Sequence, residues 1–226
     1  MRFSKAPGIL ARQFFASDYR KLRGITFLVS HMRSFSSLLS HQIGSNPEVA
    51  GYFEAHQKYR NWLDLLELAD KIHQAGGHAP AGRILFDKIL HPFEIRDAIL
   101  QRKDLKLIVL VREPQATLRS MLKIRSGGIG SVRESIDYYT QRLRDMREIL
   151  DRRRGRVLYL EAEALIEDST ATLATISEYL ELSVPLTESY QRFPMTGIGK
   201  FGDPRRGSIT AQLSVVVAKY VKRSMR

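Results

Sequence analysis

The stretch "ITFLVSHMRSFSSLLSHQIGSNPEV", residues Ile25 to Val49, decides the fold class. It opens with an apolar run typical of a buried β-strand, breaks into a loop holding His31, Arg33 and three serines, and continues as an apolar helical pattern. This order places the backbone N–H groups of residues 33–37 at a helix N-terminus, where unpaired donors and the helix dipole favour an anion. The pattern indicates an anion-binding loop, although the loop contains no glycine; the alternative is a serine-rich helix cap beside a solvated arginine.

Outside this stretch, short runs rich in Val, Ile and Leu alternate with longer helical patterns. The predicted strands are residues 24–30, 49–53, 83–86, 106–111 and 156–160. Such alternation is typical of a mainly parallel sheet covered by helices on both faces, and it predicts a three-layer α/β fold.

The longest predicted helix covers residues 131–153. Its apolar residues step by three and four along one face, while its arginines cluster elsewhere; the apolar set is Ile136, Tyr139, Leu143, Met146 and Leu150. This spacing predicts a helix that docks by one apolar stripe.

The composition is that of a folded protein with an anionic partner. The chain has 226 residues, 43% apolar and 27% charged, which predicts one domain over residues 1–226 with a basic segment at 1–23 and a basic helix at 210–226. Its 36 Lys and Arg against 24 Asp and Glu favour a nucleotide, an acidic glycan, a nucleic acid or a membrane surface. The absence of cysteine excludes disulfides and thiolate metal sites.

The length of the apolar runs indicates whether the chain could cross a membrane. None approaches the roughly 20 residues that a membrane helix needs. The N-terminal segment is interrupted by Arg12 and matches a secretory signal poorly, so we expect a cytoplasmic protein. Because the segment is basic and partly amphipathic, peripheral contact with the inner membrane surface stays open.

A second strand–loop–helix element lies in "KLIVLVREPQATLRSML", residues 106–122. A near-continuous apolar strand ends at Arg112, Pro114 stands where a helix would begin, and Ser120 follows the arginine by eight residues. The element resembles the 3′-phosphate-binding element of sulfotransferases that use 3′-phosphoadenylyl sulfate (PAPS), with Arg112 and Ser120 at its two defining positions.

The first loop then resembles the 5′-phosphosulfate loop of that family, where Pro-(Lys/Arg)-Ser-Gly-(Thr/Ser)-(Thr/Ser) follows the first strand. "MRSFSS", residues 32–37, keeps the basic residue and the hydroxyls, and it departs from the pattern at Met32 and Phe35. Phe35 replaces a glycine that lets the backbone approach the donor closely. Either its backbone adopts a compatible conformation with the ring turned away, or the ring crowds the donor and the chain has lost activity.

Three further segments extend the resemblance over residues 24–210. "PEVAGYFEAH", residues 47–56, is similar to the second-strand region of the family, which carries an acidic residue near the acceptor. The segment at 156–182 has Glu161 or Glu163 at the usual acidic position, and "GDPRRGSI", residues 202–209, is similar to the segment that closes over the 3′-phosphate.

The resemblance implies a P-loop NTPase-like fold and a metal-independent transfer of a sulfuryl group from PAPS to a hydroxyl or amine of a carbohydrate, glycolipid or other acceptor, with release of adenosine 3′,5′-bisphosphate. The implied donor-binding residues are Arg33, Ser34, Phe35, Ser36, Ser37, Arg112, Ser120, Arg205, Arg206 and Gly207. Such transfer is an in-line displacement that depends on positioning and electrostatics, and Arg33 would stabilise charge on the leaving phosphate.

The acceptor must lose a proton to a general base. Glu54 and His56 follow the second predicted strand, and the resemblance to bacterial members that sulfate sugars favours Glu54. His56 and His91 remain rivals, and Lys88 is a candidate for a charge beside the transferring group. The excess of arginine favours an acidic glycan or a membrane-borne acceptor, and the sequence does not choose between them.

Two other functions fit part of the sequence. A P-loop kinase or other nucleotide-binding protein would need G-x-x-x-x-G-K-[ST], which the chain lacks, although Asp87 could hold a metal. A basic nucleic-acid-binding protein is supported by the charge alone, since aromatic residues are few near the arginine-rich residues 142–156.

Overall fold

A computed structural model describes residues 21–123 and 131–195. In this part of the chain, five strands form one parallel sheet in the order β2-β3-β1-β4-β5. The strands are β1 (Gly24–Ser30), β2 (Val49–Ala50), β3 (Ile84–Ile89), β4 (Leu105–Val111) and β5 (Val157–Glu161).

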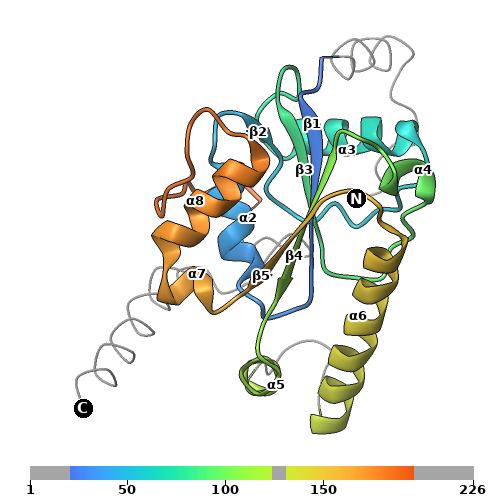
Figure 1. Cartoon of the computed structure of the whole chain (residues 1–226), viewed down its shortest axis with the longest axis vertical. Coiled ribbons are helices and arrows are strands. Elements are labelled where there is room, and N and C mark those ends of the chain that lie inside the picture. The colour runs from blue at the N-terminus through green and yellow to red at the C-terminus, as the bar shows by residue number, and fades with distance from the viewer. Residues whose placement is uncertain (1–20, 124–130, 196–226) are drawn as a thin grey trace.

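Helices cover both faces of this sheet (Figure 1). The helices α2, α7 and α8 pack on one face, and α3, α4 and α6 pack on the other. Their bounds are α2 (Ser36–Gly44), α3 (Trp62–Gln74), α4 (Asp97–Leu100), α5 (Pro114–Leu122), α6 (Val132–Arg152), α7 (Ala164–Glu167) and α8 (Ser169–Leu180). The predicted three-layer α/β fold is confirmed.

The central strand β1 is buried along its whole length. Its side chains alternate between two cores: Ile25 and Phe27 face the α3, α4 and α6 layer, while Leu28 faces α2, α7 and α8. A strand buried on both faces reads as a near-continuous apolar run. The bounds predicted for β1 are therefore the observed ones.

Two strands end three residues away from their predicted ends. β2 stops at Ala50 instead of residue 53, because Gly51 turns the chain with φ 112° and a Cβ there would lie 2.2 Å from the Phe86 carbonyl oxygen. β3 extends to Ile89 instead of residue 86 and includes Asp87 and Lys88, both buried. These two charged residues interrupt the apolar run, so the apolar pattern predicted only the first half of the strand.

The buried stripe of α6 is rotated relative to the prediction. Ile136, predicted to dock, is 44% exposed, whereas Arg142 is 1% exposed and lies on the same face as Tyr139 and Met146. The prediction that the arginines cluster elsewhere is wrong for Arg142. Its buried guanidinium is stabilised by bonds to the carbonyl oxygens of Ser30 and Ile89, at 2.9 and 2.8 Å.

Several predictions fall outside the described residues: the basic segments at either end of the chain, and Arg205, Arg206 and Gly207. Among residues 21–123 and 131–195, no helix combines the length and apolar character needed to cross a bilayer. The single-domain organisation stays a prediction.

Candidate functional site

The loop between β1 and α2 adopts backbone conformations that favour glycine. Arg33 has φ 67° and Phe35 has φ 61°, both in the left-handed region. For residues with a Cβ, this region costs roughly 1–2 kcal/mol each. Phe35 is the N-cap residue of α2, and its side chain supplies no capping hydrogen bond. The loop therefore has a left-handed backbone at residue 35, where the family pattern has glycine and this chain has phenylalanine.

The ring of Phe35 packs against the core formed by α2, α7 and α8, and the guanidinium carbon of Arg112 lies 4.1 Å from the ring centroid. At this distance the ring face attracts the cation. Phe35 thus joins the loop after β1 to the residue that follows β4.

The predicted residues of the two phosphate elements meet at the carboxyl ends of β1 and β4. The Nε of Arg33 donates to Ser120 Oγ at 2.9 Å, and an Nη of Arg112 donates to the Arg33 carbonyl oxygen at 2.9 Å. These strands are neighbours in the sheet, with Ser30 opposite Leu110. Residues some 80 positions apart in the chain therefore form one basic cluster.

Arg112 retains a donor that the cluster does not use. Its Nε is buried and makes no hydrogen bond within the described part of the chain; Glu163 Oε1 lies 3.5 Å away as an ion-pair partner. Burial lowers the pKa of Arg112, and the carboxylate of Glu163 opposes this effect. Of the two acidic candidates in the β5 segment, Glu163 is the one beside Arg112.

His31 fixes the end of β1 against the end of β4. The backbone N–H of Arg112 donates to Nε2 at 3.0 Å, and Nδ1 lies 2.8 Å from the Met32 carbonyl oxygen, so the proton is assigned to Nδ1. Burial lowers the pKa of His31 to about 4, which keeps the ring neutral at physiological pH. Tyr139 packs edge-on against the ring and donates to the Arg112 carbonyl oxygen at 2.8 Å.

The predicted serines lie in different environments. Ser34 is fully buried, and its Oγ lies 2.7 Å from the His31 carbonyl oxygen and 2.6 Å from Ser30 Oγ. Its hydroxyl shapes the loop and does not face solvent. Ser36 is also buried, whereas Ser37 is partly exposed.

Lys88 reaches the start of α2 from β3. Its Nζ donates to Ser37 Oγ at 3.2 Å, and the side chain is nearly buried. The structure thus places the predicted cation beside the loop, supplied by the strand neighbouring β1.

The three candidate bases lie together at the carboxyl ends of β2 and β3. Glu54 Oε1 lies 3.8 Å from His56 Nδ1 and 3.8 Å from His91 Nε2, and it accepts the backbone N–H of Leu90 at 3.2 Å. The imidazole centroids are 5.7 Å apart, and Phe93 packs edge-on against both rings. Burial lowers the pKa of His91, and Glu54 opposes this effect.

Sequence reasoning missed two residues of α6 that join these clusters. Arg142 binds the terminal carbonyl groups of β1 and β3, and its remaining Nη is buried without a hydrogen-bond partner in the described residues. Tyr138 Oη accepts the backbone N–H of Met32 at 3.0 Å. The one available signal was spacing, because Tyr139, Arg142 and Met146 follow a helical face.

A family model described as the sulfotransferase family matches residues 41–186, which is more than half of the chain. The chain belongs to the sulfotransferase family. Its fold is similar to that of two solved sulfotransferase domains. One comes from the curacin biosynthetic pathway, at 18% identity over 73% of this chain and 76% of that chain, with a TM-score of 0.53. The other comes from the Synechococcus PCC 7002 olefin synthase, at 19% identity over 81% and 78%, with a TM-score of 0.51. Comparison with curated protein sequences gives no match.

The carboxylate of Asp87 contacts residues of the segment after β2 and not the loop after β1. Asp87 is a buried residue of β3, and its carboxylate accepts the Tyr59 hydroxyl and, at 2.8 Å, the backbone N–H of Ala55. Burial raises the pKa of Asp87 to about 7. The carboxylate belongs to the core, so it offers no support for a kinase-like metal site.

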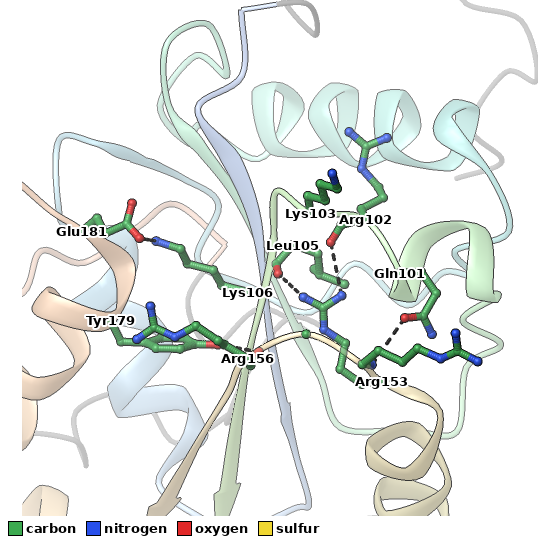
Figure 2. Close-up of a pocket in the computed structure, with 11 residues that line it drawn as sticks. Gln101, Arg102, Lys103, Leu105, Lys106, Arg153, Arg156, Tyr179 and Glu181 are labelled. Atoms are coloured by element: carbon green, nitrogen blue, oxygen red, sulfur yellow. Dashed lines mark hydrogen bonds and ion pairs between the residues drawn. The ribbon is translucent and has the colours of Figure 1, made fainter.

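A basic pocket of about 390 Å³ lies at the opposite edge of the sheet, at the amino ends of β4 and β5 (Figure 2). Arg153 donates to the Leu105 carbonyl oxygen at 2.6 Å, and Lys106 pairs with Glu181 at 2.9 Å. These cations hold the loops around them, and none of the predicted site residues lines the pocket. The family's residue types gather at the carboxyl edge, where parallel sheets bind ligands.

Proposed function

We propose that the protein transfers a sulfuryl group from PAPS to a hydroxyl or amine of an acceptor, with adenosine 3′,5′-bisphosphate as the second product. The observation that carries the proposal is the contact network of Arg33, Arg112 and Ser120, which unites the loop after β1 with the start of α5. A nucleotide with phosphates at both its 5′ and 3′ positions matches two basic elements at one sheet edge.

The loop of residues 33–37 would bind the 5′-phosphosulfate. The backbone N–H groups at the start of α2 are the natural donors, since the hydroxyl of Ser34 is buried. Ser37 and Lys88 would add a hydroxyl and a charge beside them. Buried Ser36 would contribute through its backbone.

Arg112 and Ser120 would bind the 3′-phosphate. The Nε of Arg112 lies 3.5 Å from Glu163 Oε1, and a bound phosphate would take the place of this carboxylate as the partner of the guanidinium. Phe35 would hold the guanidinium in place. Arg205, Arg206 and Gly207 would complete this subsite, as the family pattern implies.

In the reaction, the acceptor oxygen forms a bond to sulfur while the bond from sulfur to the 5′-phosphate oxygen breaks, and the leaving phosphate keeps the electron pair. Arg33 and Lys88 would stabilise its charge, and no metal would be required. The acceptor proton would pass to Glu54, whose buried carboxylate lies between two imidazoles at the same sheet edge. A carbohydrate or glycolipid is the acceptor class that we propose, with the protein cytoplasmic or peripheral at the membrane.

The test uses sulfur-radiolabelled PAPS with carbohydrate and glycolipid acceptors. We expect labelled product and release of adenosine 3′,5′-bisphosphate, both unaffected by EDTA. Glu54→Gln should retain nucleotide binding and lower turnover by roughly 10²-fold or more, since general base catalysis contributes about that much. A product that forms only with ATP and Mg²⁺ would contradict the proposal. Full activity in Glu54→Gln would show that this carboxylate is not the general base.

A further inference from the structure

Three potential metal ligands converge beside the proposed acceptor site. Glu54, His56 and His91 each offer a ligand atom within 4.8 Å of those of the other two, and Glu54 Oε1 is 3.8 Å from both His56 Nδ1 and His91 Nε2. Direct hydrogen bonds between these groups would measure about 2.7–3.2 Å. Glu54 therefore lies at ion-pair distance from both imidazoles, and the three side chains converge on one region. From this convergence we propose that they bind one divalent transition-metal ion of the Zn²⁺ type.

The ligand set suits such an ion. Two imidazoles and one carboxylate are ligands of Zn²⁺ in open sites, with bonds of about 2.0–2.2 Å and a fourth position for water. Tetrahedral bonds of that length place ligand atoms roughly 3.3–3.5 Å apart. The two carboxylate–imidazole separations of 3.8 Å would contract by a few tenths of an ångström to reach this spacing, and the imidazoles would turn towards the ion. The histidine side chains are 28% and 39% exposed, which gives the ion a path from solvent.

Paired strands precede two of the ligands. Glu54 follows β2 and His91 follows β3, and these strands are paired in the sheet. The backbone N–H of Leu90 fixes the carboxylate oxygen, which has a further lone pair for a metal. Phe93 packs against both imidazoles and restricts their rotation. The ion would therefore meet a site whose ligands are already oriented.

Nearby cations limit the affinity. Lys88 and Arg142 act electrostatically on His91. Their repulsion disfavours a doubly charged ion, so we expect micromolar binding, weaker than at structural zinc sites.

Metal binding would inhibit the enzyme, a consequence that rests on the proposed function. The ion would occupy the carboxylate oxygen that otherwise accepts the acceptor proton. Zn²⁺ would thus block turnover, and EDTA would restore it.

The test measures binding without nucleotide or turnover, so its failure is distinct from failure of the sulfotransferase assignment. Untagged full-length protein is titrated with Co²⁺, whose visible absorption reports coordination by nitrogen and oxygen, and with Zn²⁺ by calorimetry. We expect one ion per chain. Glu54→Gln and His91→Ala should each weaken binding by about tenfold or more, since each removes a ligand from a site with only three.

The matched control is His73→Ala, which removes an exposed histidine of α3 outside the cluster. It should leave both titrations unchanged. Circular dichroism confirms that each variant is folded, and the partly exposed His56 gives a further variant if Glu54→Gln unfolds. Undiminished binding in the His56→Ala/His91→Ala double variant, or no spectral change at millimolar Co²⁺, would overturn the proposal.

Discussion

The substitution pair Phe35→Gly and Phe35→Ala separates two features of the loop after β1, its backbone conformation and the ring of Phe35. Phe35 combines φ 61° with a ring that lies under the Arg112 guanidinium. Both variants lose the ring, but only glycine adopts the left-handed conformation without cost. That conformation destabilises the folded alanine variant by roughly 1–2 kcal/mol. The greater conformational entropy of glycine in the unfolded chain destabilises the glycine variant by about 0.4–1 kcal/mol, which offsets part of this difference. The glycine variant should therefore be the more stable of the two by about 0.5–1 kcal/mol.

Loss of the ring should affect nucleotide binding through Arg112. A cation–π contact contributes about 0.5–2 kcal/mol. Both variants should consequently bind adenosine 3′,5′-bisphosphate several-fold more weakly than the wild type. Free energies of unfolding from urea titrations and dissociation constants from calorimetry measure the two effects.

Two results would refute this reasoning. Equal stability of the alanine and glycine variants, or a more stable alanine variant, would show that the backbone of residue 35 is not in the left-handed region. Tighter nucleotide binding by Phe35→Gly would show that the ring crowds the donor.

Two further substitutions test the buried polar groups. Arg142→Leu should lower the free energy of unfolding by roughly 2–4 kcal/mol, because it leaves the buried carbonyl groups of Ser30 and Ile89 without donors; an unchanged urea midpoint would contradict this. Asp87→Asn tests a pH dependence. Since the pKa of Asp87 is raised to about 7 from an ordinary value of 3.8, the folded protein keeps a proton that the unfolded chain has released, and this group's contribution to stability falls as pH rises from 4 to 7. The variant should gain stability relative to the wild type across that window, by an amount on the order of a few kcal/mol, and hold a constant difference above it; a difference independent of pH would contradict the assignment.

The sequence allowed the central strand and the basic cluster to be predicted because both depend on local patterns. The apolar run of β1 is buried on both faces, and the run itself marks the bounds of the strand. Arg33, Arg112 and Ser120 follow strands whose carboxyl ends share one sheet edge, so a parallel sheet brings them together.

The missed features depend on contacts between distant segments. An arginine on an amphipathic helix is normally solvated, and only the carbonyl groups at the ends of β1 and β3 explain why Arg142 is buried. The role of His31 depends in the same way on the backbone N–H of Arg112, 81 residues away. The second half of β3 could not be predicted because burial of Asp87 depends on hydrogen bonds from Tyr59 and Ala55, which lie far from it in the sequence.

The measurement that tests the central claim most directly is calorimetry of adenosine 3′,5′-bisphosphate and adenosine 5′-monophosphate with the wild type and Arg112→Ala. A hydrogen bond to a charged group contributes about 1.5–3 kcal/mol. The wild type should therefore prefer the bisphosphate by tenfold or more, and Arg112→Ala should lose that preference while keeping its weaker binding of the monophosphate. Arg119→Ala, which changes an exposed arginine of the same helix that carries Ser120, should behave as the wild type. Equal affinity of the wild type for the two nucleotides, or an unchanged preference in Arg112→Ala, would contradict the account.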